Sequence, residues 1–107
     1  MKGTIYVLED DASISGLIRF SLEREQLVCR TFGSVQEFYA GLKESVPDVA
    51  LPDIMLPGGN GLDVLKDVKQ KHPGVCCIML SALGQGGDKV TGLNMGADDY
   101  ISKPFGV

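Results

Sequence analysis

Apolar residues along the chain form two alternating patterns, which are short β-rich runs and longer stripes with helical spacing. The β-rich runs predict strands at Thr4–Leu8, Leu27–Phe32, Asp48–Asp53, Val75–Leu80 and Asp98–Ser102. The stripes between them predict helices, and their apolar residues are Ile14, Leu17, Ile18 and Leu22, then Val35, Phe38, Tyr39 and Leu42, then Leu62, Leu65 and Val68. A fourth helix is expected over Gln85–Met95, where several glycines lower the helical propensity.

Capping and breaking residues agree with these helices. Ser34 followed by Glu37 forms a capping box, and Asn60 can cap the third helix. Pro47 ends the second helix, and Pro73-Gly74 ends the third.

The strands and helices alternate from end to end, without repeats or linkers. Right-handed crossovers then produce a parallel sheet with helices on both faces, which is a doubly wound α/β fold. A length of 107 residues fits one domain, so residues 1–107 are interpreted as a single unit.

Composition narrows the function classes. The net charge is −4 and the pI is about 4.8, which argues against nucleic-acid binding by this domain itself. No apolar stretch reaches membrane-spanning length, and the start at Met1 lacks a signal-peptide core, so no membrane association and a cytoplasmic location are expected.

The thiols and the histidine do not have metal-ligand spacing. Cys29, Cys76 and Cys77 form no CxxC pair, and they are interpreted as small apolar core residues. His72 is expected at the end of a helix, where a cation suits the helix dipole.

Polar side chains follow four of the predicted strands. Glu9 and Asp10 come after the first strand, Asp53 ends the third, Ser81 follows the fourth, and Lys103 follows the fifth. Ligands of such sheets bind outside the carboxyl ends of the strands. Acids, a hydroxyl and a lysine at one sheet edge could hold a divalent cation and a phosphoryl group.

These residues resemble the receiver domain of two-component response regulators, the CheY-like family. The resemblance covers nearly the whole chain in the family's order and spacing, through Val7–Asp11, Pro47-Asp48, Asp53–Pro57, Gly61-Leu62, Met79–Ala82 and Gly96–Phe105. The Gly96–Phe105 stretch is most similar to regulators of the winged-helix OmpR/PhoB type. The resemblance implies a flavodoxin-like five-stranded sheet in the order 2-1-3-4-5.

The resemblance also implies roles for individual residues. Asp53 would be the phosphoacceptor, and Ser81 and Lys103 would contact the phosphoryl oxygens. Mg²⁺ would be the cofactor, with Glu9, Asp10, Asp53 and the Met55 carbonyl as its ligands. Tyr100 would be an aromatic switch that follows Ser81.

By the same resemblance, the domain would be a phosphoacceptor switch and not an enzyme acting on other substrates. A sensor histidine kinase would be its partner, and a homodimer is a further partner to consider. Transcription would be controlled through a DNA-binding output domain that this chain does not contain.

Each site residue also has a simpler interpretation. Glu9-Asp10-Asp11 could cap the first helix, Ser81 could be an ordinary strand-end residue, Lys103 a solvated charge, and Tyr100 a core aromatic. We favour that interpretation for Asp11, and we interpret Asp98-Asp99 as a solvated turn. It is improbable that the simpler interpretations of all the other residues hold at once at one sheet edge.

Three other functions compete with the switch. A haloacid-dehalogenase-type phosphatase needs a second aspartate two residues after its nucleophile, and Met55 occupies that position. A nucleotide-binding module needs a GxGxxG or GxxxxGK[ST] loop, which this sequence lacks. The alternative that remains is a degenerate receiver, acting as a phosphorylation-independent protein-interaction module.

Two features depart from the family pattern. Pro52 has no N–H and fits poorly in a central strand, where one carbonyl loses its donor at a cost of roughly 1–3 kcal/mol. The sequence also stops at Val107, before the family's fifth helix. Either the sequence is a fragment, or an apolar patch is left for a partner or a second copy, and poor stability or self-association is predicted.

Overall fold

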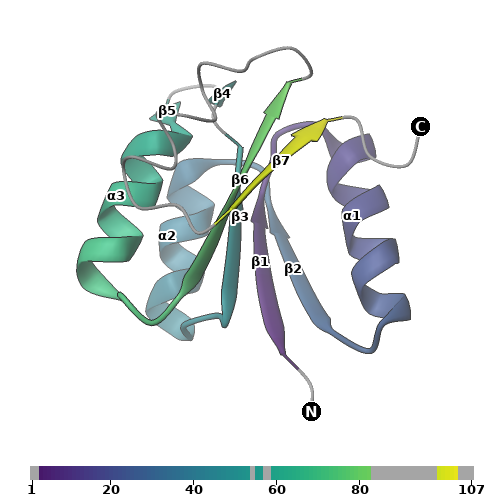
Figure 1. Ribbon diagram of the computed structural model, residues 1–107, viewed down its shortest axis with the longest axis horizontal. Helices are drawn as coiled ribbons and strands as arrows, with labels where there is room; N and C mark the ends of the chain where they lie inside the picture. The colour runs from purple at the N-terminus through teal and green to yellow at the C-terminus, as the bar shows by residue number, and fades with distance from the viewer. Residues whose placement is uncertain (1–2, 54, 57–58, 83–98, 104–107) are drawn as a thin grey trace.

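The computed structural model describes the backbone of residues 3–53, 55–56, 59–82 and 99–103, and the side chains of residues 3–53 and 61–80. Within these residues one five-stranded sheet carries helices on both faces (Figure 1). The predicted doubly wound α/β fold is therefore confirmed.

The sheet has the order β2-β1-β3-β6-β7, and all of its neighbouring strands run parallel. This is the predicted 2-1-3-4-5 order, because a small antiparallel pair, β4-β5, accounts for the two extra labels. The strands are β1 (Thr4–Leu8), β2 (Val28–Phe32), β3 (Val49–Pro52), β4 (Met55–Leu56), β5 (Gly59–Asn60), β6 (Cys76–Ala82) and β7 (Asp99–Lys103).

Three described helices cover the sheet. α1 (Ala12–Arg24) lies on one face, and α2 (Val35–Glu44) and α3 (Gly61–Lys71) lie together on the other (Figure 1). The fourth helix predicted over Gln85–Met95 lies outside the described residues.

Predicted and observed strand bounds differ by one or two residues. β1 matches its prediction, whereas β2 and β3 start one residue later than expected. Asp53 lies just past β3 and pairs with Leu80 of β6 through one isolated bridge. β6 extends two residues beyond the predicted Leu80, so Ser81 belongs to the strand itself.

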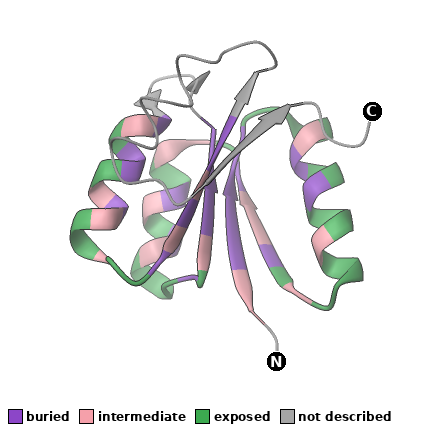
Figure 2. Ribbon diagram, in the orientation of Figure 1, coloured by how far each residue is buried: buried purple, intermediate pink, exposed green. Residues whose placement is uncertain are grey.

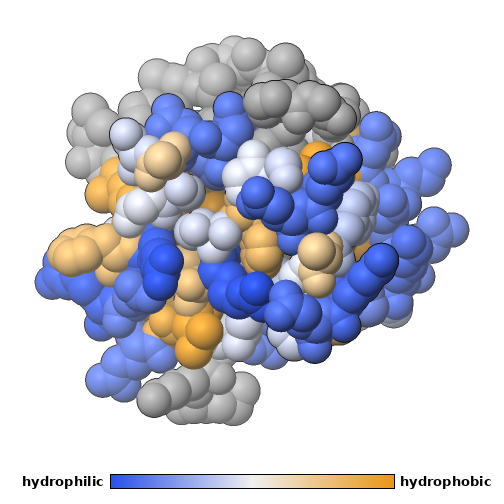
Figure 3. All heavy atoms as spheres, turned by 180° about the vertical axis from the view of Figure 1, so that it is seen from behind, coloured by the Kyte–Doolittle hydropathy of each residue, from blue (hydrophilic) through white to orange (hydrophobic). Residues whose placement is uncertain are grey.

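Alternate residues of the strands face two separate cores. Tyr6 and Leu8 of β1 pack in the cluster on the α2–α3 side, whereas Ile5 and Val7 pack in the cluster on the α1 side. Buried positions accordingly concentrate in the central strands and on the inner faces of the helices (Figure 2). Seen from behind, the described surface is mostly hydrophilic with separate hydrophobic areas (Figure 3).

The helical stripe predicted for α1 was wrong at Leu17. Ile18 is buried and Ile14 and Leu22 pack against the core, but Leu17 is 45% exposed. Leu17 lies at the flank of the stripe, and α1 is the single helix on its face in the part of the chain that the structure describes. Phe20 on the same helix is also exposed.

α2 is held to the sheet by a buried tyrosine and a glycine. The Tyr6 hydroxyl lies 3.0 Å from the Ser45 carbonyl oxygen, to which it can donate, and 2.6 Å from the Ser45 Oγ. A Cβ added at Gly41 would lie 2.6 Å from the Phe32 ring, closer than real Cβ atoms approach. Only glycine therefore lets α2 approach the aromatic core this closely.

Side-chain capping agrees with the sequence in part. The Ser34 side chain accepts a hydrogen bond from the Glu37 N–H, as predicted, while the Glu37 carboxylate accepts from the Gly33 N–H and not from Ser34. The side chain of Asn60 lies outside the described residues. His72 directly follows α3, as expected.

The cysteines behave mostly as apolar residues. Cys29 and Cys77 are buried, but Cys76 is only half-buried, so the core interpretation was wrong for Cys76. It adjoins buried Cys77 in β6, and neighbouring strand residues point to opposite faces. Burial raises the pKa of the Cys29 thiol, which favours its inert, protonated form. None of the described helices combines the length and apolar character needed to span a bilayer.

Pro52 interrupts the sheet where the sequence suggested that it would. β3 pairs with β6 at Val49 and Ala50, and pairing resumes in the same register only at the Asp53–Leu80 bridge. In that register, the missing pairs are those of residues 51 and 52. Each of these pairs needs a hydrogen bond from the N–H of residue 52 to the Ile78 carbonyl, and proline has no N–H. Pro52 itself is fully buried.

We expect Pro52→Leu to raise the melting temperature, because it restores one ladder donor beside a buried strand. A gain of about 1 kcal/mol corresponds to a shift of roughly 4–8 °C for a domain of this size. The measurement is a thermal melt followed by circular dichroism. Pro47→Leu is the matched control, since buried Pro47 precedes β3 and should lower the midpoint. An unchanged or lower midpoint for Pro52→Leu would contradict the interpretation.

Candidate functional site

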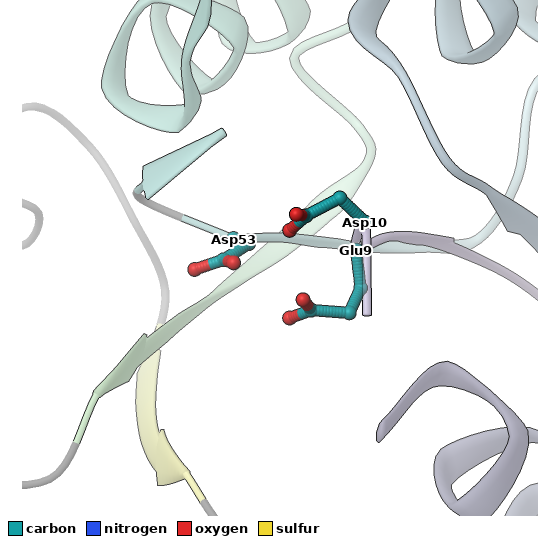
Figure 4. Close-up of side chains that lie close together, drawn as sticks. All are labelled: Glu9, Asp10 and Asp53. Atoms are coloured by element: carbon teal, nitrogen blue, oxygen red, sulfur yellow. The ribbon is translucent and has the colours of Figure 1, made fainter. Parts of the chain in front are cut away.

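Three carboxylates gather at the carboxyl edge of the sheet. Glu9 and Asp10 follow β1, and Asp53 follows β3. One oxygen of each lies within 4.8 Å of the others, and their side chains project beside the strand ends (Figure 4). The structure therefore brings together the three acids that the sequence predicted as metal ligands.

Strand register fixes the separation of these acids. β1 and β3 are adjacent and pair Leu8 with Pro52, so the next residues, Glu9 and Asp53, fall at the same level. The Glu9 N–H donates to the Phe32 carbonyl at 3.0 Å, and the Asp53 N–H donates to the Leu8 carbonyl at 2.8 Å. The backbone of Glu9 and Asp53 is thus held by the sheet.

Burial makes this cluster electrostatically costly. Glu9 and Asp53 are each 3% exposed, whereas Asp10 is exposed. Two like charges 4.8 Å apart repel by about 3 kcal/mol at an effective dielectric constant of 20. A small cation that prefers oxygen ligands would relieve this repulsion, and carboxylates are the donors that such cations take.

Asp11 has a different role from its neighbours. It is the N-cap of α1, and its side chain accepts hydrogen bonds from the Ser13 N–H at 2.9 Å and the Ile14 N–H at 3.3 Å. This confirms the helix-start interpretation. Its own N–H donates to Glu9 Oε1 at 3.0 Å, a contact that the sequence pattern did not reveal.

The backbone places the remaining predicted site residues on neighbouring strands. Ser81 follows Leu80, the bridge partner of Asp53, and Lys103 pairs with Ala82 in the β6–β7 ladder. Tyr100 pairs with Met79 in the same ladder. The side chains of Ser81, Tyr100 and Lys103 lie outside the described residues, so their roles stay predictions.

Met55 begins β4, two residues after Asp53. Its role as a carbonyl ligand also stays a prediction. No aspartate occupies that position, so the sequence argument against a dehalogenase-type phosphatase is unchanged.

A family model for the response regulator receiver domain matches residues 5–107. The DNA-binding transcriptional regulator NtrC of Salmonella typhimurium is 38% identical over 106 residues, which cover 99% of this chain and 23% of that protein. The DNA-binding response regulator MtrA of Mycolicibacterium paratuberculosis is 40% identical over 105 residues, which cover 98% of this chain and 46% of that protein. The chain thus spans less than half the length of either relative.

Solved structures agree with the sequence relatives. The crystal structure of NtrX from Brucella abortus superposes with a TM-score of 0.93 at 31% identity, and the match covers 98% of this chain and 24% of that one.

We expect Asp11→Ala to lower the free energy of unfolding by about 1 kcal/mol, because the first turn of α1 loses its cap. Urea denaturation would measure the change. Asp11→Asn is the control, since asparagine caps as well as aspartate and should leave stability nearly unchanged. Equal losses in both variants would show that charge, and not capping, is the contribution of Asp11.

Proposed function

The chain belongs to the response regulator receiver domain family, and we propose that it is a switch in which a sensor histidine kinase phosphorylates Asp53. The observation that carries the proposal is the buried Asp53 carboxylate, grouped with two other acids at the carboxyl edge of the sheet. A structural role alone would not favour three acids in this place, because their repulsion opposes folding.

Mg²⁺ fits the donor set of this cluster. Asp10 and Asp53 would hold it directly, Glu9 would support it, and the Met55 carbonyl would be a further ligand. When bound, Mg²⁺ supplies positive charge that offsets the acids and the phosphoryl oxygens. Exposed Asp10 leaves the cluster open to solvent on one side, which suits a cation that keeps several waters.

For phosphoryl transfer, the protein would supply the nucleophile and the side chains that contact the phosphoryl group. An Asp53 carboxylate oxygen attacks the phosphorus of a phosphohistidine, so a P–O bond forms and the P–N bond breaks. The electron pair of the broken bond stays on the imidazole nitrogen, which takes up a proton. Ser81 would donate to a phosphoryl oxygen, and Lys103 would offset its charge.

The phosphoryl group would act as the signal. It adds about −1.5 to −2 charges and new acceptor oxygens at the end of β3. Ser81 would move toward them, and Tyr100 would follow, shifting a two-state surface. The output would be transcription through a separate DNA-binding domain, since the relatives NtrC and MtrA are both DNA-binding regulators. A homodimer is a further partner of this switch, and no reaction on other substrates is proposed.

Acetyl phosphate with Mg²⁺ should add one phosphoryl mass to the chain, and intact-protein mass spectrometry would detect it. Asp53→Asn should abolish the addition, because the nucleophile is lost. Asp63→Asn is the matched control, since Asp63 is exposed in the first turn of α3 and should leave the addition unchanged. No addition by a folded chain would favour the degenerate receiver.

Mg²⁺ should also raise the melting temperature, because it binds the folded cluster and not the unfolded chain. At ten times its Kd the stabilisation is about 1.4 kcal/mol. Asp10→Asn should reduce the shift, Asp63→Asn should keep it, and EDTA should reverse it. A thermal melt with and without Mg²⁺ measures this, and an equal shift in Asp10→Asn would argue against the cluster as the binding site.

A further inference from the structure

A hollow lies between the last turns of α2 and α3, far from the acidic cluster. These helix ends lie at the opposite end of the sheet from the carboxyl ends of the strands (Figure 1). The cavity has a volume of about 430 Å³, within the usual range for small-molecule sites. We call it the helix-end groove.

The floor of the groove is apolar and partly aromatic. Tyr39 and Leu42 contribute from α2, and buried Val68 contributes from α3. Tyr39 and Leu42 pack against the core cluster that contains Val68, so the floor is continuous with the core and does not depend on a loop. Such a floor offers an apolar or aromatic molecule a place out of water.

The rim of the groove is basic. Lys43, Lys71 and His72 line it, and the two lysines are exposed. In the part of the chain that the structure describes, no ion pair is recorded for either lysine, whereas Arg19 and Arg30 each have a carboxylate partner. Two ammonium groups are therefore available to an anion at the mouth of the groove.

Among the described residues that line the groove, the one acid, Asp67, already has a partner. Asp67 accepts a hydrogen bond from the Tyr39 hydroxyl at 2.8 Å. Burial and this bond raise the pKa of Tyr39, so the hydroxyl remains a donor to Asp67. The bond joins α2 to α3 across the groove and holds the floor in shape.

We propose that the helix-end groove binds a small amphipathic carboxylate. Its apolar body would lie over Tyr39, Leu42 and Val68, and its carboxylate would lie between Lys43 and Lys71. A cavity of about 430 Å³ has room for an aromatic ring or a short aliphatic chain. The groove shares no residue with the acidic cluster, so the proposal does not rest on the proposed function.

A simpler explanation exists for the basic rim. Cations in the last turn of a helix complement the helix dipole, and both lysines occupy such positions. That effect accounts for the lysines but not for an apolar hollow between them. It also requires no ligand in the groove, so saturable binding there separates the two explanations.

The test is a titration of the chain with phenylbutyrate and with the uncharged phenylbutanol, followed by amide chemical shifts in two-dimensional NMR. We expect saturable shifts in residues 39–43 and 67–72, with a Kd of roughly millimolar for the acid. The alcohol should bind about fivefold more weakly, since it cannot pair with the lysines. Lys43→Gln with Lys71→Gln should remove that preference.

Lys66→Gln is the matched control, because Lys66 is exposed on α3 and does not line the groove. It should keep the preference for the acid. Equal binding of acid and alcohol by the native chain would overturn the proposal. So would an absence of saturable shifts at the groove, or a loss in Lys66→Gln as large as in the double variant.

Discussion

The rest of this structure must offset one unfavourable interaction, the repulsion among three carboxylates. Glu9 and Asp53 are buried side by side, and Asp10 adds a third charge from the surface. The mutual repulsion of these charges opposes folding. The cluster persists because adjacent parallel strands hold its backbone, and two apolar cores stabilise those strands. The stability of the sheet thus supports an arrangement that is unfavourable on its own.

The sequence predicted that Glu9, Asp10 and Asp53 would meet because these residues share a topological position. A parallel sheet brings all carboxyl ends to one edge, so residues that follow different strands meet without any knowledge of tertiary detail. The features that the sequence could not predict depend on residues that are neighbours in space. The exposure of Leu17 follows from which elements flank α1, and the contact between the Asp11 N–H and Glu9 follows from the path of one turn. The order of the strands came from family resemblance, since alternation alone permits other orders.

The local preferences of proline conflict with the position of Pro52 in the fold. Strand statistics exclude proline from a central strand, yet β3 lies between β1 and β6. The structure accommodates it at the last residue of the strand, where the ladder to β6 breaks and then resumes at Asp53. Asp53 therefore has firm backbone support from β1 and only one bridge on its other side. Asp53 thus lies where the sheet holds the backbone more strongly from β1 than from β6.

The close approach at Gly41 makes the two helices on that face unequal. α2 is held by directional hydrogen bonds from Tyr6 and by a contact that tolerates no added atom. α3 is held by packing of Val64, Leu65 and Val68, which has no preferred direction, and by the hydrogen bond from Tyr39 to Asp67. α2 is therefore the more firmly fixed of the two helices, and α3 is the more adjustable one. Any adjustment of α3 would strain or break the Tyr39–Asp67 hydrogen bond, so it would also reshape the helix-end groove that the two helices form.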